Sequence, residues 1–345
     1  MSTRNKPPIP LNDARKLTWP QFCTRAAALR NLALPAEPGL AVRTALSSVQ
    51  GVADMQGLVN AAILQGFADE RDTTAGWVRV VDLPNYLQAE IATVDEPPRL
   101  EQVPRGQTAP TVNFGVSSEG WRLARFGAQF LLDEQDLLDA KPLGVDLLAY
   151  EQLGRAARRL VPDLVYAVVL SNAPMGDATA LFDAGRGNYA TAALADTALD
   201  AGLAAVSNQI QTDEQGDPIH RGLQARYLVL PGDLVGLGRR LVRNMDTGDP
   251  ESRLIVRGES RLSAAGLVDP RSDEIVAGTA TNWMLACPAE QAAGIVVGAI
   301  GGNLTPRIRT FEPGEGRWGV GFDASLSLAC TALDAQSLYW STGAP

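Results

Sequence analysis

Residues 166–231 read YAVVLSNAPMGDATALFDAGRGNYATAALADTALDAGLAAVSNQIQTDEQGDPIHRGLQARYLVLP and form the most strongly patterned stretch of this chain. The apolar residues at its start end a long helix, because the turn Asn172–Asp177 contains both proline and glycine. A second turn at 185–188 precedes an alanine-rich helix that we expect over Ala190–Gln211. An acidic loop then leads to a strand predicted over Arg226–Pro231. The side chains of this stretch offer no group equipped for catalysis, so its pattern specifies architecture and not chemistry.

The helix that enters this stretch is predicted over residues 145–170 and is the longest of the chain. Its apolar stripe consists of Leu153, Ala157, Leu160, Leu164 and Val168. Pro162 lies inside the pattern, and an interior proline destabilises a helix by about 3 kcal/mol. We therefore predict a bend near Leu160–Pro162. Arg155, Arg158 and Arg159 fall on another face, where either solvent exposure or pairing at an interface would satisfy them.

The segment Trp77–Leu132 is predicted to form a long hairpin. Trp77–Val81 is rich in β-forming residues, and alternating apolar side chains mark a second strand at Phe126–Leu132. Turn chemistry lies between them, at residues 95–98, 103–106 and 117–120. This hairpin has few large apolar side chains, and an isolated two-stranded hairpin is only marginally stable in water. We therefore expect it to be stabilised against another subunit, which is an argument for assembly on physical grounds alone.

Helices and strands are also expected through the rest of the chain. Helices are predicted over 56–70 and 232–244, and strands over 283–287 and 294–300. The clearest β signal is Val320–Ala332, where apolar and polar side chains alternate as in a strand with one buried face. This mixture of helices and strands places the chain in the α+β class.

The length and composition of the chain exclude several classes of protein. With 345 residues, 46% of them hydrophobic, it can bury the core of one large module or of two interlocked modules. Its apolar runs stay below the roughly 20 residues that span a bilayer, and the N-terminus lacks the apolar region of a signal peptide. The three cysteines, Cys23, Cys287 and Cys330, are far apart, which favours reduced, buried thiols over a disulfide framework or a metal cluster.

Charge is distributed unevenly in this chain, whose net charge is −9. Asp13 is the only acidic residue among the first 31, and the basic residues there are Arg4, Lys6, Arg15, Lys16, Arg25 and Arg30. Such a basic segment either lies on an acidic neighbour or a polyanion, or is a solvated tail. Lysine is rare in the whole chain, so most of its cations are arginines, which pair through a planar fork.

The chain offers few groups suited to catalysis. Its single histidine, His220, lies in a polar loop, and no Gly-x-Ser-x-Gly motif accompanies it, so neither a catalytic triad nor a His-based metal site is predicted. Gly319–Ala324 has a Gly-x-Gly-x-x-Ala spacing, but it leads into a strand, whereas a dinucleotide motif requires a helix.

Carboxylates gather in three clusters, and paired carboxylates can carry out acid–base catalysis. The clusters are Asp133-Glu134-Asp136-Asp139, Asp213-Glu214-Asp217 and Asp269-Asp273-Glu274. Each lies in a loop or at the start of a helix, where acidic side chains cap the backbone or are solvated, and we favour that role. We therefore predict no catalytic, cofactor-binding or metal site.

Several separated blocks resemble the major capsid proteins of tailed double-stranded DNA phages, in the order in which that family has them. The blocks are Pro98–Gly106, Leu123–Gly127 (as the return strand of the hairpin), Gly154–Leu160 with Leu170–Asn172, Thr179–Phe182 with Gly187–Asn188, Arg226–Pro231, and Leu338–Trp340 with Gly343. The resemblance runs from near Gly57 to the C-terminus. Each block alone is unspecific, but their joint order is hard to obtain by chance.

The resemblance implies the Hong Kong 97-type major capsid fold, which is an α+β architecture. Its parts would be an N-terminal arm (1–55), a helix and strand leading into the loop (56–83), an extended β-hairpin loop (84–132), a peripheral domain with a long spine helix and long strands (134–176 and 288–337), an axial domain (177–287) and a C-terminal tail (338–345). Pro162 departs from the family, whose spine helix is usually uninterrupted. Some relatives lock their shells by Lys–Asn isopeptide bonds, but Lys141 is the only lysine here outside the arm, so we predict non-covalent locking.

The leading hypothesis is a structural head protein, and not an enzyme, that self-assembles into the hexamers and pentamers of an icosahedral shell around phage double-stranded DNA. Its partners would be copies of itself, the portal, decoration or scaffolding proteins, and DNA contacted non-specifically through arginines of the arm, with no cofactor and no membrane. Its location would be the virion, and the host cytoplasm during assembly. An encapsulin-like nanocompartment shell of the same fold is the alternative, and an α+β hydrolase with a carboxylate pair is a remote one.

Overall fold

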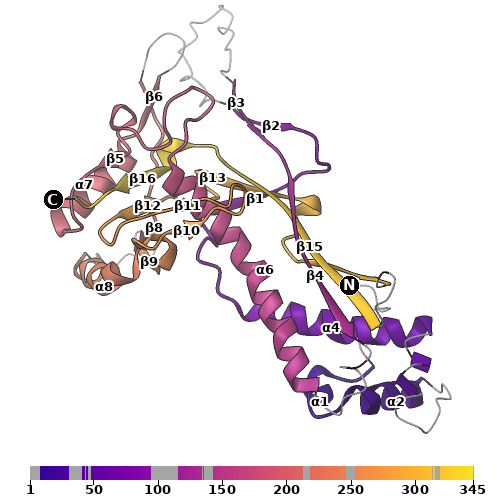
Figure 1. Cartoon of the computed structure of the whole chain (residues 1–345). Coiled ribbons are helices and arrows are strands. Elements are labelled where there is room, and N and C mark those ends of the chain that lie inside the picture. Colours follow the sequence, from indigo (N-terminus) through magenta and orange to yellow (C-terminus); the bar gives the residue numbers. More distant parts are fainter. Residues whose placement is uncertain are drawn as a thin grey trace, which may run out of the picture. The chain divides into compact units, whose positions relative to one another are not determined.

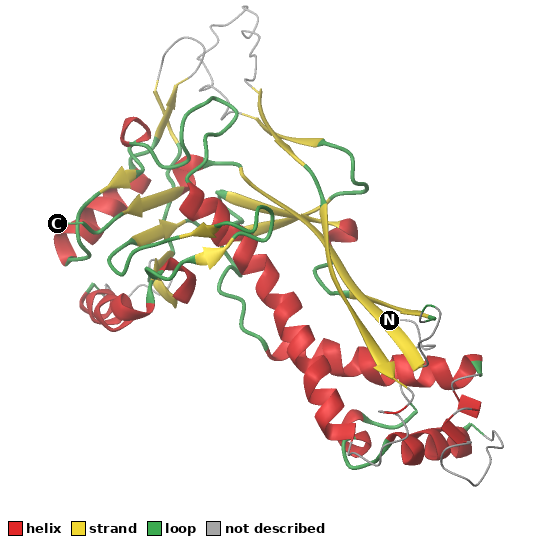
Figure 2. Cartoon of the chain, in the orientation of Figure 1, coloured by secondary structure: helices red, strands yellow, loops and turns green. Residues whose placement is uncertain are grey.

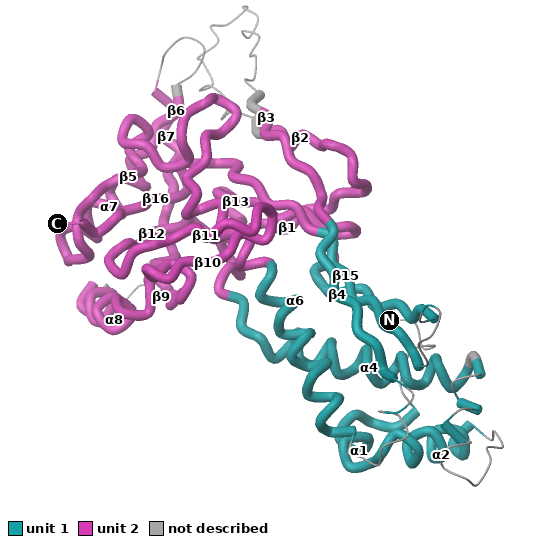
Figure 3. Tube along the Cα trace, in the orientation of Figure 1, with its two compact units in different colours: residues 1–72, 125–160, 304–327 teal, residues 73–124, 161–303, 328–345 magenta. Residues whose placement is uncertain are grey.

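The computed structural model describes residues 8–30, 41–42, 44–45, 48–94, 116–133, 135, 143–212, 218–245, 253–312, 314 and 319–344. Helices and strands are both abundant in these residues (Figure 2), as the α+β prediction requires. The chain divides into two compact units (Figure 3). Unit 1 consists of Met1–Asp72, Arg125–Leu160 and Leu304–Ser327, and unit 2 of Thr73–Ala124, Val161–Asn303 and Leu328–Pro345.

Unit 1 contains the helices α1 (Leu11–Ala14), α2 (Trp19–Leu29), α4 (Val49–Asp69) and the first part of α6 (Leu143–Ser171). Side chains define where two of them begin. Thr18 and Gln21 form a capping box at the start of α2, and the Ser48 hydroxyl accepts a hydrogen bond from the Gly51 amide, 3.0 Å away, at the start of α4. Helix α4 therefore begins seven residues before the expected helix at 56–70. The helices enclose a core that includes Trp19, Phe22, Leu58, Ile63, Leu147 and Phe322.

Helices α4 and α6 touch through their backbones. A Cβ atom built on Gly66 would lie 2.0 Å from the carbonyl oxygen of Glu151, and one on Gly154 would lie 2.0 Å from that of Ile63. A side chain at either position would collide with the backbone of the other helix. Because glycine has no side chain, the two helices can pack this closely. Beside this crossing, Arg158 pairs with Asp72 at 3.0 Å and its guanidinium lies 4.9 Å from the centre of the Phe67 ring.

The predicted long helix is confirmed, and α6 continues from Leu143 to Ser171 with Pro162 in its interior. The proline therefore does not split the helix, and the predicted bend stays a prediction. The boundary between the two compact units falls between Leu160 and Val161, directly before this proline. Beyond it, residues 164–169 are all buried, and the Tyr166 ring lies 5.9 Å from that of Trp77.

The long strand β15 (Gly319–Ala332) is present as predicted, and it contributes to both units. In unit 1 it pairs with β4 (Ala124–Asp133) and, antiparallel, with β14 (Arg307–Phe311). In unit 2 it pairs antiparallel with β13 (Ile295–Ala299), which in turn pairs in parallel with β1 (Val78–Asp82).

The expectation that β15 has only one buried face was wrong. The alternating apolar residues from Phe322 to Ala332 are buried, but so are Gly321, Ser325 and Ala329 on the other face. The Phe311 ring covers Gly321 so closely that a Cβ there would lie 2.4 Å from it. Ala329 packs in a second apolar cluster together with Leu83 and Trp121. A strand that is covered on both sides can carry small residues and Ser on the face that was expected to be exposed.

The extended hairpin is formed by β2 (Ala89–Val94) and β3 (Val116–Trp121), which pair antiparallel from Ala89 opposite Trp121 to Val94 opposite Val116. The turn expected at 117–120 is therefore wrong, because these residues belong to β3. Leu123–Gly127 were expected to lie in the return strand of this hairpin, but from Ala124 onward they belong to β4, whose partner is β15. The turns expected at 95–98 and 103–106 lie outside the described residues.

Unit 2 contains a five-stranded sheet in the order β5-β16-β12-β8-β9 (Figure 1). The strands are β5 (Tyr189–Ala190), β16 (Leu338–Ser341), β12 (Trp283–Ala286), β8 (Tyr227–Leu230) and β9 (Ile255–Gly258). Strands β8, β12 and β16 are buried along their whole length. The strands predicted at 226–231, 283–287 and 294–300 are thereby confirmed.

Helices α7 (Asp196–Ser207) and α8 (Val235–Asn244) cover one face of this sheet. Gly202 of α7 lies against Trp283, Leu285 and Tyr339, and Gly238 of α8 lies against Leu228 and Leu230. Strand register places Leu228 and Tyr339 opposite Leu285, so these side chains share a face. On the other face the Phe182 ring stacks on Trp340, with centroids 5.5 Å apart.

The remaining elements of unit 2 are short. Two small hairpins are formed by β6 (Ile210–Thr212) with β7 (Pro218–His220) and by β10 (Leu267–Val268) with β11 (Ile275–Val276). Helix α7 is shorter than the predicted 190–211, because Ala190 belongs to β5 and residues 210 and 211 belong to β6. Turns of 3-10 helix lie at Ala184–Arg186, Gly232–Leu234, Ser260–Leu262, Ile300–Gly302 and Ala335–Ser337.

Candidate assembly surfaces

The structure keeps the candidate chemical groups apart. Cys23, Cys287 and Cys330 are unpaired and buried as predicted, and burial raises the pKa of each thiol to about 12. These thiols therefore stay protonated and poorly nucleophilic at neutral pH. His220 ends strand β7 with its side chain exposed. Within the described ranges, no group of three His, Cys, Asp or Glu residues is arranged to hold a metal ion.

The acidic cluster at 269–274 is a structural clamp. The carboxylate of buried Asp269 accepts hydrogen bonds from the Arg271 backbone amide at 2.9 Å and from its Nη2 at 2.8 Å. Burial alone would raise the pKa of this carboxyl group, but the bonds from Arg271 outweigh it and lower the pKa below its usual value. The clamp bridges the loop between β10 and β11, where Asp273 adopts a left-handed conformation (φ +59°). This carboxylate therefore holds a turn together, as the sequence favoured.

The two other acidic clusters lie mostly outside the described residues. Asp133 is described, and its side chain accepts a hydrogen bond from the Gln135 amide at 2.8 Å, which is a capping interaction. Glu134, Asp136 and Asp139 fall outside, and so does the cluster Asp213-Glu214-Asp217. The Gly319–Ala324 pattern lies inside strand β15 and does not precede a helix.

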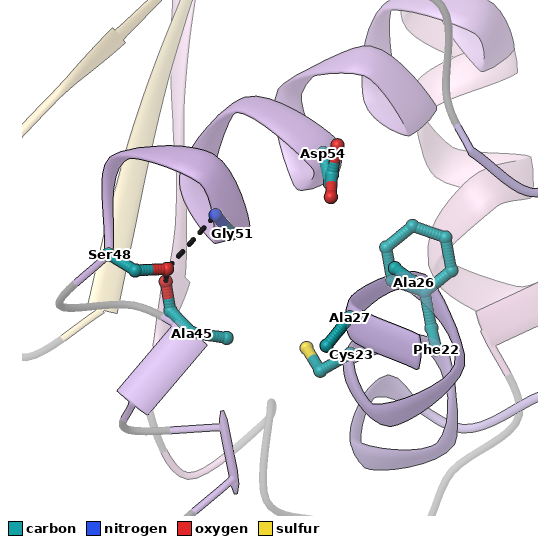
Figure 4. A pocket seen from close by; sticks show the side chains of 8 residues that line it. All are labelled: Phe22, Cys23, Ala26, Ala27, Ala45, Ser48, Gly51 and Asp54. Carbon is teal, nitrogen blue, oxygen red and sulfur yellow. Dashed lines mark hydrogen bonds between the residues drawn. The ribbon is translucent and has the colours of Figure 1, made fainter. Parts of the chain in front are cut away.

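A small pocket in unit 1 has no room for a ligand (Figure 4). Its volume is about 20 Å³, enough for a single water molecule. The lining residues are Phe22, Cys23, Ala26, Ala27, Ala45, Ser48, Gly51 and Asp54. The Asp54 carboxylate is already paired with Arg30, at 2.6 and 3.0 Å, and also accepts a bond from Gln50. We assign this pocket to packing between α2 and α4.

In the described residues, the hairpin β2–β3 is anchored in unit 2 at its root and through Glu119. Leu83, Trp121 and Leu123 belong to an apolar cluster with Val296 and Ala329. A carboxylate oxygen of Glu119 also accepts a hydrogen bond from the Gly176 amide, at 2.6 Å, just beyond the end of α6. No local sequence pattern indicates this contact, because it joins residues 57 positions apart.

Apart from these contacts, the described part of the hairpin has little support. In the part of the chain that the structure describes, β2 and β3 pair only with each other. Glu90, Ala92 and Ser118 are exposed. The loop that precedes β2 also exposes Tyr86 and Leu87, and the Leu87 side chain is 72% exposed. Exposed side chains on both strands are what we expect of a hairpin that lacks a core of its own.

A second exposed apolar pair lies on the short hairpin β10–β11. Val268 and Ile275 are direct cross-strand neighbours, and both are exposed, Ile275 to 72%. Neighbouring exposed apolar side chains of this kind are a feature of surfaces that contact other proteins. The described residues include no helix that is both long and apolar enough to cross a membrane. The exposed apolar side chains of the loop before β2 and of the hairpin β10–β11 are candidate surfaces for protein contacts.

Comparison with known families agrees with this interpretation. The family model described as phage capsid protein matches residues 117–341, which is more than half of the chain. This chain belongs to the phage capsid protein family. The capsid protein has no match among curated proteins.

Several solved structures resemble the capsid protein in fold at low sequence identity. It is similar to the virus-like particle from Pyrococcus furiosus, with 11% identity, a TM-score of 0.50, and coverage of 82% of this chain and 97% of that one. The capsid of cyanophage P-SCSP1u is similar at 9% identity and a TM-score of 0.48, covering 77% of this chain and 86% of the other. The capsid of Myoviridae phage XM1 has 10% identity and a TM-score of 0.44, with coverage of 79% and 92%.

The expected family and the expected Hong Kong 97-type fold are thereby confirmed, and the protein is a structural component of a capsid shell. The assignment of residue ranges to arm, loop, peripheral and axial domains stays a prediction.

Proposed function

We propose that this capsid protein assembles with itself into hexamers and pentamers that close an icosahedral shell around phage double-stranded DNA. Membership in the phage capsid protein family is the observation that carries the proposal. The hairpin β2–β3 supports it, since its strands leave the body of unit 2 without cover of their own. Contacts between two different surfaces of identical subunits generate rings when the rotation closes, which is the geometry that capsomers need.

The proposal gives each segment a role in the shell. The basic residues of 1–55 would act as an arm on a neighbouring subunit or on DNA, 84–132 as a loop reaching over a neighbour, and 177–287 as the axial domain at capsomer centres. Portal, decoration or scaffolding proteins would be further partners, in the host cytoplasm during assembly and then in the virion. The protein would not act as an enzyme, and its protonated, buried thiols and isolated His220 support that view.

Expression of the chain followed by size-exclusion chromatography and negative-stain microscopy tests this proposal. We expect particles in the megadalton range that appear as hollow shells, tubes or capsomer rings. A chain that stays monomeric over a wide range of concentration and salt would overturn the proposal.

A cellular nanocompartment shell is the second candidate, because the fold is also that of a virus-like particle from Pyrococcus furiosus. The contents of particles purified from the native source separate the two functions. Nuclease-resistant DNA inside the particles supports the viral function, and an enclosed protein without DNA supports the compartment.

A further inference from the structure

Helix α8 presents three arginines to solvent. Arg239, Arg240 and Arg243 are exposed, and within the described residues their side chains form no ion pair or hydrogen bond. Arg239 and Arg243 are four residues apart, and Arg240 and Arg243 are three apart, so all three lie on one side of the helix. Like charges at this spacing destabilise a helix. The arrangement is therefore unfavourable in a single copy of the chain.

Helix α7 presents the opposite charge. Asp196 and Asp200 are exposed, four residues apart, and neither carboxylate has a partner in the described part of the chain. Ala201 and Ala204 are exposed in the following turns. The outer surface of α7 is thus acidic near its start and has small side chains towards its end, which leaves room for long arginine side chains.

Helix dipoles explain only part of the charge pattern on α7 and α8. A negative charge in the first turn of a helix and a positive charge in its last turn stabilise the helix, which accounts for Asp196 of α7 and Arg243 of α8. Asp200 and Arg239 lie outside those turns, where the dipole has little effect. An exposed arginine or aspartate is ordinary by itself, but two unpaired stripes of opposite charge on one unit call for a common explanation.

The two helices cover different halves of the sheet in unit 2. Helix α7 packs over β16 and β12, and α8 over β8 and β9, as the labels in Figure 1 show. They are therefore two different surfaces of one subunit. A ring of identical subunits requires two such surfaces, which must be complementary to each other.

We propose that α8 of one copy packs antiparallel against α7 of a second copy, with Arg239, Arg240 and Arg243 paired to Asp196 and Asp200. The antiparallel direction follows from the charges, since the carboxylates lie in the first half of α7 and the arginines in the second half of α8. It also places the positive end of the α7 dipole beside the negative end of the α8 dipole. The exposed Gly236 of α8 then faces the exposed alanines of α7, where small residues allow close contact.

The inference rests on the proposed self-assembly and adds which surfaces meet within a ring. DNA is the other polyanion that the arginines could bind. Contact with DNA would leave the carboxylates of α7 without a role, whereas a second copy accounts for both stripes.

Single reversals in the middle of each helix test the pairing without disturbing the helix ends. Arg239→Glu and Asp200→Arg should each raise the concentration needed for assembly at least tenfold, as measured by light scattering, because each creates like-charge contacts across the interface. The chain that carries both substitutions should assemble close to the wild-type threshold. Arg79→Glu is the matched control, because Arg79 is exposed on β1 in the same unit, and it should leave assembly unchanged.

Mixing the two single variants gives a second readout. In an alternating ring positions 239 and 200 carry opposite charges at every contact, so a 1:1 mixture should assemble where neither variant does alone. A ring of five cannot alternate fully, so the mixture should form flat or tubular arrays of hexamers more readily than closed shells.

Normal assembly of both single variants would overturn the inference. So would a doubly substituted chain that fails to assemble although circular dichroism shows it folded. A third contrary result is that Arg239→Glu forms normal shells and loses only salt-sensitive DNA binding. A wild-type chain that does not assemble would instead contradict the proposed function itself.

Discussion

At the scale of single residues, glycines and one carboxylate have the clearest structural roles. Gly66 and Gly154 allow α4 and α6 to touch through their backbones, and the contacts join residues that are far apart in the sequence. Nothing in the local pattern distinguishes these glycines from others in the chain, so only the packed helices reveal why they are needed. The same is true of Asp269, whose role as a clamp depends on its burial beside Arg271.

Replacing Gly154 with alanine should destabilise unit 1. The added methyl group would have to fit 2.0 Å from the Ile63 carbonyl oxygen, so the helices must separate, and overpacking of this kind lowers the free energy of unfolding by about 1–3 kcal/mol. Urea denaturation of dissociated subunits measures the change. Gly232→Ala is the control, because a Cβ there meets nothing within 4 Å. Equal stability of the two variants would contradict the backbone contact.

Replacing Asp269 with asparagine should change how stability depends on pH. Because folding lowers the pKa of this carboxyl group, the carboxylate contributes to stability above its unfolded pKa of about 3.9, and the contribution is lost as the pH falls through the lower folded pKa. The variant should therefore be less stable than the wild type at neutral pH, by about 1–3 kcal/mol. The difference should shrink in strong acid.

Unfolding by urea at a series of pH values follows this difference. Asp273→Asn serves as the control, because Asp273 lies in the same loop but is exposed, and asparagine tolerates its left-handed backbone. A deficit for Asp269→Asn that stays constant down to low pH would show that the charge of Asp269 is not what stabilises the loop.

At the scale of elements, local patterns predicted which segments form helices and strands, but not which strands pair. The periodicity of 145–170 predicted α6, and the alternation of Val320–Ala332 predicted β15. The pattern at Phe126–Leu132 correctly indicated a strand, yet its partner is β15 and not the predicted Trp77–Val81, whose strand β1 pairs with β13. Alternation reports which side chains share a face, and it contains no information about the strand that lies alongside.

Replacing Glu119 with alanine should loosen the hairpin β2–β3. The substitution removes the hydrogen bond from the Gly176 amide, one of the few contacts that hold this hairpin at its root. We expect faster hydrogen exchange of the β2 and β3 amides and easier proteolysis of the hairpin in dissociated subunits. Glu90→Ala is the matched control, because Glu90 lies on β2 opposite Gly120 and is exposed. Similar exchange in both variants would argue against an anchoring role for Glu119.

At the scale of the whole molecule, the distribution of chemical groups favours assembly without covalent locking. Lysines are scarce, and the one outside the arm, Lys141, lies outside the described residues. The cysteines are buried, and burial raises the pKa of each thiol to about 12. Contacts between copies would then depend on shape, apolar burial and charge, as in the pairing inferred between α7 and α8.

Mature particles should therefore dissociate completely into monomers when they are boiled in detergent without a reducing agent. A single band on a denaturing gel is the expected result. A ladder of covalent oligomers that persists after reduction would mean that isopeptide or similar bonds link the subunits.

The sequence by itself determined the α+β class, the long helix α6, the strands β8, β13 and β15, and the resemblance to phage capsid proteins, because these depend on periodicities and on the order of blocks along the chain. Only the tertiary structure decided that β4 joins β15, that both faces of β15 are covered, and that α4 and α6 meet at two glycines. It also revealed that the charged faces of α7 and α8 have no partner in the described part of their own chain. Such features depend on which distant surfaces meet, and a local pattern of residues specifies the surface but not its partner.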